Sequence, residues 1–444
     1  MKKVIALLLV LTLLLSGCSG KESSYEAEPE TDIAKMELTE PTEELGCAGT
    51  DAMHWYNDEV ADFGLGLLRG SMNTEKNVLI SPVSVLAALS MTANGAEGDT
   101  LTQMETVLGK NKDALNQWYE YDIVKARSEY LYLANAIYLK DDGELAVKES
   151  FLQTLEKWYE TGVYMTSFNE STLREINQFV EDNTNGMVKK ILDKIPEEAV
   201  MYLVNALAFE AQWAKPYNEY EVSQRVFTTE DGREQTIELM YSEEYDVYLE
   251  DELFTGFVKD YEGGRYAFAA LLPKEGVSVK EVADALSKAD ITHKINNRWG
   301  GTVLTAMPKF QTEFDVEMSE VLKNMGMTDA FDDEKANFSG MGTYAGEDLF
   351  ISRVLHKTFI SVAEQGTRAG AATVIEAAAE AAMPEETKAV ILNRPFLYMI
   401  WDRETNMPIF MGTFMDAQAP GTSVPAETDE IFYSPAEDPC MMEG

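Results

Sequence analysis

The chain has 444 residues, of which 45% are hydrophobic, and a formal net charge of −41. This hydrophobic content allows a full-sized core, and the length suits one large domain or two ordinary ones. So large a negative charge excludes a nucleic-acid-binding surface, which needs clustered Lys and Arg. The only histidines are His54, His293 and His356, which leaves little room for His-based catalysis or a metal site, and we expect no cofactor.

The N-terminus has the pattern of an export signal. Met1-Lys2-Lys3 gives a basic start, and the apolar run at 4–15 is too short for a stable membrane span. The Leu-Ser-Gly-Cys sequence at 15–18 resembles a bacterial lipoprotein cleavage site, which implies removal of residues 1–17 and lipidation of Cys18. An ordinary signal peptide with an incidental cysteine is the alternative. We therefore predict a bacterial surface protein that is lipid-anchored to a membrane and faces outward, or is extracellular.

Two polar segments flank the part of the chain that can form a core. Residues 18–50 are rich in Glu, Pro, Thr and Ser, which is typical of a solvated tether, and 419–444 form an acidic tail without Lys or Arg. Cys47 and Cys440 lie in these flanks; in an exported protein they can pair or remain free thiols, and both possibilities stay open. Between 51 and 418 no charge block, linker or repeat marks a second domain.

Helix signals come first along the chain, and strand signals dominate later. Val60, Phe63 and Leu67 have helical spacing, and Ser81 provides a capping hydroxyl before a first-turn proline. Apolar, aromatic-rich runs bounded by turn residues predict strands at 130–140, 199–213, 266–274 and 396–415. The last run is predicted to be a hairpin that turns at 403–406. This order of elements indicates an α+β fold rather than alternating βαβ units.

The common catalytic and nucleotide-binding motifs are missing. The sequence contains no zinc-protease, dithiol, P-loop or nucleophile-elbow pattern. A Ser-His-Asp hydrolase needs a histidine presented at a cleft. His356 lies within the strand-like run VLHKTFISV, which favours a hydrogen-bonded core histidine. An unrelated surface hydrolase is therefore a weak alternative, and we predict that the chain is not an enzyme.

Seven segments, in order, resemble the signature sequences of serpins. They are NVLISPVSVLAALSMTANGAEGDTLTQM (77–104), INQFVEDNTNGMVKKIL (176–192), LVNALAFEAQWAKPY (203–217), MPKF (307–310), MGMTDAFDDEKANFSGM (325–341), LHKTFISVAEQGT (355–367) and NRPFLYMIWDRETNMPIFMGTF (393–414). The resemblance covers essentially all of 51–418. It implies a serpin fold with three β-sheets, eight or nine helices, a metastable native state and an exposed reactive-centre loop at about 364–393.

The resemblance also implies a mechanism. In inhibitory serpins a target serine protease attacks the reactive-centre loop and forms an acyl-enzyme. The cut loop then inserts as a strand into the central sheet and carries the protease to the far pole, where its distorted active site cannot deacylate. The expected partner is thus a serine protease in a covalent complex, and the expected inhibitor is a monomer that is consumed.

The segment after Glu364 is compatible with such an insertion. Gln365-Gly366-Thr367 has turn composition, and the Ala-rich run after it suits a loop, a helix or a strand. As a strand, one face would hold Thr367, Ala369, Ala371, Thr373 and Ile375. Both charges, Arg368 and Glu376, fall on the other face, so insertion would bury no charge in the core, where an unpaired ion is costly. The resemblance gives hinge roles to Glu364, Gly366, Thr367, Ala369, Gly370, Ala371 and Ala372, whereas Arg368 replaces the usual acidic residue.

Two further groups of residues match the family's control points for sheet opening. The resemblance places Ser81, Ser84, Asn205 and His356 in the shutter, and Trp213, near Glu364, in the breach. Plain core packing is the alternative for each of them.

The resemblance makes Glu364 the family's hinge glutamate, and the usual loop length of serpins then implies a scissile bond between Glu380 and Ala381. The loop is a few residues longer than in common serpins, so a cut at Ala379, Ala381, Ala382 or Met383 is an alternative. Cleavage beside Ala or Met indicates an elastase-like protease, which we favour, and cleavage after Glu380 a glutamyl-specific one. No Lys or Arg lies between 369 and 387, which disfavours trypsin-like targets. An inhibitor of a cysteine protease and a non-inhibitory serpin that acts as a surface binding module are the remaining alternatives.

Overall fold

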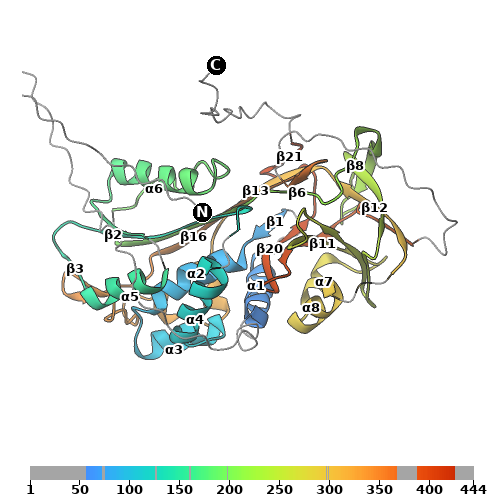
Figure 1. Cartoon of the computed structure of the whole chain (residues 1–444). Coiled ribbons are helices and arrows are strands. Elements are labelled where there is room, and N and C mark those ends of the chain that lie inside the picture. Colours follow the sequence, from blue (N-terminus) through green and yellow to red (C-terminus); the bar gives the residue numbers. More distant parts are fainter. Residues whose placement is uncertain are drawn as a thin grey trace, which may run out of the picture. The chain divides into compact units, whose positions relative to one another are not determined.

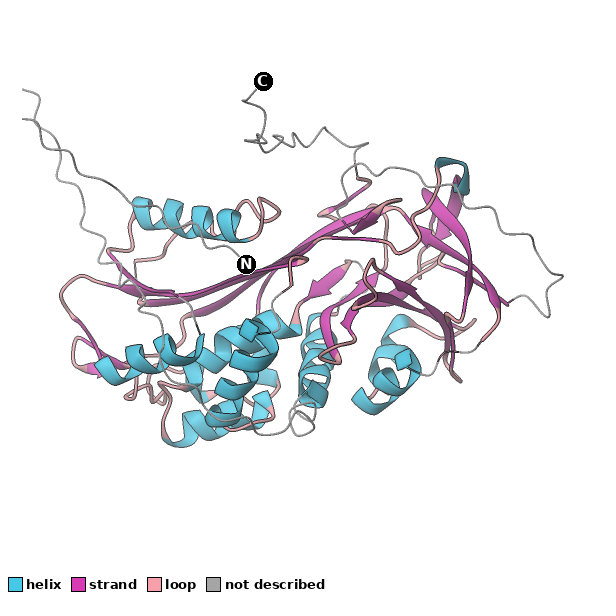
Figure 2. Cartoon of the chain, viewed as in Figure 1, coloured by secondary structure: helices cyan, strands magenta, loops and turns pink. Residues whose placement is uncertain are grey.

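In the computed structural model, the residues described are 57–425, apart from 73–75, 126–127, 160–161, 198, 297, 299 and 368–387. This part of the chain holds nine α-helices (Figures 1 and 2). They are α1 Asn57–Ser71, α2 Pro82–Ala93, α3 Gly98–Leu108, α4 Lys112–Trp118, α5 Glu149–Tyr159, α6 Glu170–Asn183, α7 Val279–Ala285, α8 Lys288–Asn296 and α9 Ser319–Asn324. A π-helical turn, Tyr119–Lys125, continues α4, and short 3₁₀ turns lie at Glu219–Glu221 and Asp329–Phe331. None of the described helices is long and apolar enough to span a membrane.

The predicted start of the second helix is confirmed. The Ser81 side chain accepts a hydrogen bond from the Ser84 N–H at 3.3 Å, and Pro82 occupies the first helical position, where its missing N–H is not needed. Every residue of α2 is buried. A helix that is buried on all sides belongs in the middle of a core. Accordingly, α2 contacts α1 and three strands, β2 (Leu131–Lys140), β5 (Met201–Phe209) and β20 (Met407–Phe414).

The central eight-stranded sheet carries the features on which function depends. In spatial order its main path is β21 Thr422–Ser423, β13 Phe310–Glu317, β16 Arg353–Val362, β5 Met201–Phe209, β2 Leu131–Lys140 and β4 Gly162–Thr166. Two short strands, β6 Ala211–Gln212 and β17 Gly366–Thr367, complete it at one end. β5 and β16 run parallel and pair directly, with Tyr202 opposite Arg353 and Leu207 opposite Thr358.

Two other large sheets pack around this one. The six-stranded sheet has the order β1 Val78–Ile80, β20 Met407–Phe414, β19 Phe396–Asp402, β11 Tyr266–Pro273, β10 Phe254–Asp260 and β9 Tyr248–Glu250. The predicted hairpin is its β19–β20 pair, and Asn406 in the turn has a φ of 57°, a left-handed conformation that asparagine tolerates. The four-stranded sheet has the order β18 Lys388–Ile391, β12 Thr302–Pro308, β8 Glu234–Tyr245 and β7 Val222–Thr228.

The α+β class and the predicted strands are confirmed, with one addition. A fourth, three-stranded sheet is formed by β15 Glu347–Asp348, β14 Gly342–Tyr344 and β3 Leu145–Val147. Its strands are too short and too exposed to produce an apolar run in the sequence. Within the segment predicted as tail, β21 pairs with β13 of the central sheet. The boundaries at 51 and 418 stay predictions.

Helices cover both faces of the central sheet (Figure 1). On one face, Ile176 and Val180 of α6 pack over Tyr138, Tyr202 and Val204 of β2 and β5. On the other face, α2 joins the main core that the central sheet shares with the six-stranded sheet. Because strand residues alternate between faces, both faces of β5 are apolar, and all nine of its residues are buried.

Candidate functional site: the hinge and the central strands

The chain leaves β16 through a tight turn and comes back as β17. The backbones of Ala363 and Gly366 exchange hydrogen bonds of 3.0 and 3.3 Å. Thr367 then pairs antiparallel with Val362 of β16 and with Ala211 of β6. β17 therefore lies between β16 and β6, just beyond the last pair of the β5–β16 ladder.

Gly366 and Thr367 fit this gap closely. A Cβ on Gly366 would lie 2.2 Å from the Ala211 carbonyl oxygen, so only glycine lets the two backbones approach this far. The Thr367 side chain is fully buried, and its hydroxyl forms a 2.6 Å hydrogen bond with the hydroxyl of Tyr261, which directly follows β10. The side chain of Thr367 therefore faces the core.

A segment that follows β6 holds the turn in place from outside. The Trp213 N–H donates to the Gln365 carbonyl, its indole Nε1–H to the Ala363 carbonyl, and the Tyr217 N–H to the Glu364 carbonyl, each at 2.9 Å. Three consecutive carbonyl groups of the turn are thus bonded to one short segment. The breach residue Trp213 and the hinge residue Glu364, which the sequence placed near each other, do lie together.

An ion pair closes the same turn. Lys309, between β12 and β13, lies 2.9 Å from a carboxylate oxygen of Glu364, and the two side chains are only 9% and 23% exposed. A half-buried pair of this kind is screened less by solvent than a surface pair. The sequence analysis did not single out Lys309, although a lone lysine within the apolar motif MPKF was the signal available.

The predicted shutter residues form a buried cluster in the middle of β5 and β16. The Ser81 N–H donates to His356 Nε2 at 3.0 Å, and His356 Nδ1 lies 3.1 Å from Asn205 Oδ1. The Ser84 hydroxyl also donates to Asn205 Oδ1, and Asn205 Nδ2 donates to the Ser84 carbonyl and to Asn135. All four predicted residues are completely buried. Asn205 therefore connects α2 with both central strands.

Burial keeps His356 neutral. It lowers the pKa of His356 from its ordinary 6.5 to about 3. The hydrogen bonds also indicate a neutral imidazole ring, because Nε2 accepts from the Ser81 N–H while Nδ1 carries the proton toward Asn205 Oδ1. A second proton would put Nε2–H against the Ser81 N–H, so the expectation of a hydrogen-bonded core histidine is confirmed.

We expect His356 to make the folded state sensitive to acid. Between pH 6.5 and 3 the unfolded chain binds a proton at this side chain and the folded chain does not, so stability falls as pH falls. At pH 4.5 the loss from this one group is about 2–3 kcal/mol. Urea unfolding of wild type and His356→Gln at pH 7.5 and 4.5 measures it. The variant should lose less stability over this interval, and equal losses would show that His356 does not titrate on unfolding.

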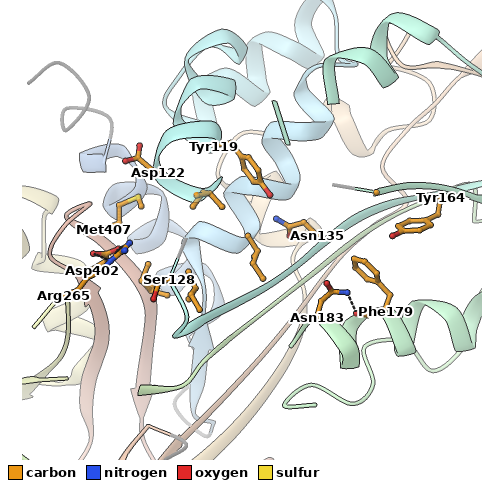
Figure 3. Close-up of a pocket in the computed structure, with 15 residues that line it drawn as sticks. Tyr119, Asp122, Ser128, Asn135, Tyr164, Phe179, Asn183, Arg265, Asp402 and Met407 are labelled. Atoms are coloured by element: carbon orange, nitrogen blue, oxygen red, sulfur yellow. Dashed lines mark hydrogen bonds and ion pairs between the residues drawn. The ribbon is translucent and has the colours of Figure 1, made fainter. Parts of the chain in front are cut away.

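A separate cavity of about 430 Å³ lies between β2, the π-helical turn and the β19–β20 hairpin (Figure 3). Arg265 and Asp402 lie side by side on its wall and form an ion pair at 2.7 Å. Ser128 lines it too, but no histidine or cysteine is among its described lining residues. In the described part of the chain no group of His, Cys, Asp and Glu side chains could hold a metal ion. This cavity gives no support to a hydrolase.

A family model described as serpin (serine protease inhibitor) matches residues 58–417. The chain belongs to the serpin family. An uncharacterised serpin-like protein of Thermococcus kodakarensis is 29% identical to it, over 94% of this chain and 99% of its own length. The serpin fold predicted from the resemblance is thereby confirmed, and so is protease inhibition as the general activity of the family.

Solved serpin structures resemble this one over most of the chain. The thermophilic serpin tengpin in its native state has 41% sequence identity and a TM-score of 0.78, with 85% of this chain and 97% of that chain covered. The latent state of tengpin has a TM-score of 0.72. Human thyroxine-binding globulin, solved with thyroxine, has 26% identity and a TM-score of 0.73, covering 82% of this chain and 99% of that one. The family thus also contains a thyroxine-binding member.

Several predicted serpin sites lie outside the described residues. These are Cys18, Cys47, Cys440, the loop residues Ala369, Gly370, Ala371 and Ala372, and the candidate scissile positions Ala379, Glu380, Ala381, Ala382 and Met383. The remaining hinge, shutter and breach residues form the two clusters above, and their roles stay predictions. The sequence analysis missed the contacts that Asn135, Tyr217, Tyr261 and Lys309 make at these clusters.

Proposed function

We propose that this serpin inhibits serine proteases of elastase-like specificity as a suicide substrate, from a lipid-anchored position outside a bacterial cell. The target protease would attack the loop between β17 and β18, and insertion of the cut loop into the central sheet would trap the acyl-enzyme. Family membership supports protease inhibition in general. The choice of target and the anchor rest on the Ala-rich loop and on the sequence around Cys18.

The direct parallel pairing of β5 with β16 is the observation that carries the proposal. A strand placed between two parallel strands can run antiparallel to both of them, and antiparallel pairing is slightly more stable per residue. β17 already has this orientation between β16 and β6. Residues that follow Thr367 would continue in the same direction and replace the six β5–β16 pairs from Arg353↔Tyr202 to Thr358↔Leu207.

The burial of Thr367 determines which loop residues would enter the core. Because its side chain faces the core and bonds to Tyr261, every second residue after it would face the core as well. Those residues are Ala369, Ala371, Thr373 and Ile375. Arg368 and Glu376 would lie on the opposite face, so no charge would be buried under the sheet.

Both ends of the loop are attached to sheets. This attachment opposes insertion of the uncut loop, so the free energy of insertion is released only after the loop is cut. β17 joins the central sheet, and β18 pairs parallel with β12 at the edge of the four-stranded sheet. An uncut loop can insert only by pulling β18 away from β12. Once cut, an inserted strand of about a dozen residues gains on the order of 10 kcal/mol, because each new backbone hydrogen bond contributes ~0.5–1.5 kcal/mol.

We expect the detergent-solubilised full chain to form a covalent adduct with pancreatic elastase. The acyl-enzyme is an ester, so the adduct should survive denaturing electrophoresis, and mass spectrometry should detect one released C-terminal fragment that starts between 380 and 384. Elastase with a blocked active-site serine is the control and should give no adduct. A glutamyl-specific protease is tested in parallel, since an adduct with that enzyme alone would reassign the target. Cleavage by every protease without any adduct would indicate a non-inhibitory serpin.

We expect Cys18→Ser to release the protein from membranes. Only a lipidated Cys18 would hold the chain there, because the apolar run before it is too short to span a bilayer. Expression of both forms in a bacterial host, followed by fractionation and immunoblotting, measures the membrane-bound share. Ser19→Ala, at the neighbouring position, should stay membrane-bound. Equal membrane binding of the Cys18 variant and wild type would reject the anchor.

A further inference from the structure

A buried ion pair that the family resemblance did not predict lies next to the hinge. Lys259, on β10 of the six-stranded sheet, has a side chain only 3% exposed. Its Nζ is 2.6 Å from a carboxylate oxygen of Glu244, on β8 of the four-stranded sheet, whose side chain is 14% exposed. The Ser242 hydroxyl donates to the same oxygen at 2.8 Å. The pair therefore joins two sheets.

The ammonium group of Lys259 also lies against the aromatic side chains that hold the hinge. Its Nζ is 4.4 Å from the ring centroid of Tyr217 and 5.8 Å from that of Trp213, both within cation–π range. Tyr217 is fully buried, and among the described residues its hydroxyl has no hydrogen-bond partner. Packing and the cation beside it therefore fix the position of the Tyr217 ring.

Lys259 is linked to the hinge through two residues that it contacts directly, Tyr217 and Trp213. The backbone of Tyr217 donates to the Glu364 carbonyl, and the Trp213 indole donates to the Ala363 carbonyl. These bonds tie the segment after β6 to the turn from which the loop would continue into the central sheet. Lys259 thus contacts the side chains of the two residues whose N–H groups restrain the turn.

We propose that Lys259, held by Glu244, is a positioning residue for loop insertion: it keeps Tyr217 and Trp213 against the turn at 363–366 and so slows opening of the central sheet. This inference rests on the proposed inhibitory function. It adds a second restraint to the Lys309–Glu364 pair, which acts on the Glu364 side chain, whereas Lys259 acts on the carbonyls of the turn.

Stability alone gives no reason for a lysine at this place. Exchange of a buried ion pair for apolar residues of similar size is often neutral or stabilising. Burial lowers the pKa of Lys259, while Glu244 opposes that shift, so a charged Lys259 at this place carries a desolvation cost. What an apolar residue cannot provide is a directed contact between a fixed cation and the faces of two aromatic rings.

The test uses the full chain and compares three variants with wild type. Lys259→Met leaves Glu244 without its cation. Lys259→Met/Glu244→Met removes both charges, so no buried ion is left unpaired. Lys294→Met is the matched control, because Lys294 has the same kind of partners, Asp251 at 2.7 Å and the Phe254 ring at 5.7 Å, on α8 away from the hinge.

Three quantities are measured for each variant. Hydrogen exchange reports the protection of segments 211–217 and 363–367, urea unfolding reports global stability, and elastase titration after incubation without protease reports the lifetime of the active inhibitor. For Lys259→Met we expect exchange in both segments and the loss of activity on standing to be about tenfold faster, the size of coupling seen between contacting residues. For Lys294→Met we expect hydrogen exchange in the hinge segments and the lifetime of the active inhibitor to stay near wild type.

The double variant separates positioning from simple charge burial. We expect its urea midpoint to return toward wild type, because the unpaired charge is gone, while hinge exchange stays fast, because the cation is gone. Wild-type protection of the hinge in the double variant, or in Lys259→Met, would overturn the proposal. Absence of any wild-type adduct would reject the inhibitory function separately, and hydrogen exchange would still test the positioning. If Lys259→Met does not fold, Glu244→Gln takes its place.

Discussion

Replacement of Thr367 by arginine is expected to turn this serpin from an inhibitor into a substrate. Thr367 is fully buried between β16 and β6, with its hydroxyl on Tyr261. A guanidinium there would need a partner that the site does not offer, and burial of an unpaired charge costs several kcal/mol. The loop would still be cut but would insert too slowly to trap the acyl-enzyme. The ratio of adduct to cleaved serpin on denaturing gels should fall at least about tenfold, since 1.4 kcal/mol already gives that factor.

Arg368→Ala is the matched control for this prediction. In an inserted strand residue 368 would lie on the face opposite Thr367, so the loss of its charge should leave the adduct ratio within about twofold of wild type. The rate of cleavage should be similar in both variants, because neither changes the residues around 380–383. A Thr367→Arg protein that traps elastase as well as wild type would contradict insertion through this gap.

Local signals in the sequence were enough to predict individual elements. The Ser81 cap, the β19–β20 hairpin and the buried state of His356 follow from residues that are near one another in the chain. The resemblance then supplied what local patterns could not, which is the serpin fold and the grouping of Ser81, Asn205 and His356. These residues are far apart in sequence, and the parallel β5–β16 pair brings Asn205 opposite His356.

Two largely buried lysines escaped the sequence analysis. Lys259 lies on β10 and Lys309 between β12 and β13, and their partners Glu244 and Glu364 lie on another sheet and in a turn. No periodic pattern marks such a pair, because its meaning depends on tertiary contacts. The sequence analysis also did not predict that the hinge begins with a short strand. Gly366–Thr367 has turn composition, yet it forms β17 because Ala211 and Val362 offer free backbone groups on both sides.

Asn205→Ala is expected to destabilise the closed central sheet much more than the loop-inserted form. In the closed sheet Asn205 lies opposite His356 and bonds to it and to Ser84. Its removal leaves several buried polar groups without partners, each worth ~1–3 kcal/mol, so we expect a net loss of about 3–5 kcal/mol.

The inserted form should be much less affected, for a geometric reason. Neighbouring strands lie about 4.8 Å apart, so a strand inserted between β5 and β16 would move them to about 9.6 Å, beyond hydrogen-bond reach. Asn205 and His356 would then be separated in wild type as well, so truncation of Asn205 would remove no contact between them. The bond from Asn205 to Asn135, on the β2 side of β5, would be lost in both forms. Cleaved, loop-inserted protein can be prepared with a non-target protease that cuts within residues 368–387.

Urea unfolding of the native and cleaved forms measures this difference, with Asn116→Ala as the control. Asn116 is also buried, and it bonds to Tyr159 at 2.5 Å and to Asn94 at 2.8 and 2.9 Å where α2, α4 and α5 meet, away from the β5–β16 pair. Its truncation should therefore destabilise the native and cleaved forms about equally. If Asn205→Ala also shifted both midpoints equally, the shutter cluster would be ordinary core packing, because a control on sheet opening must act on the closed sheet and not on the open one.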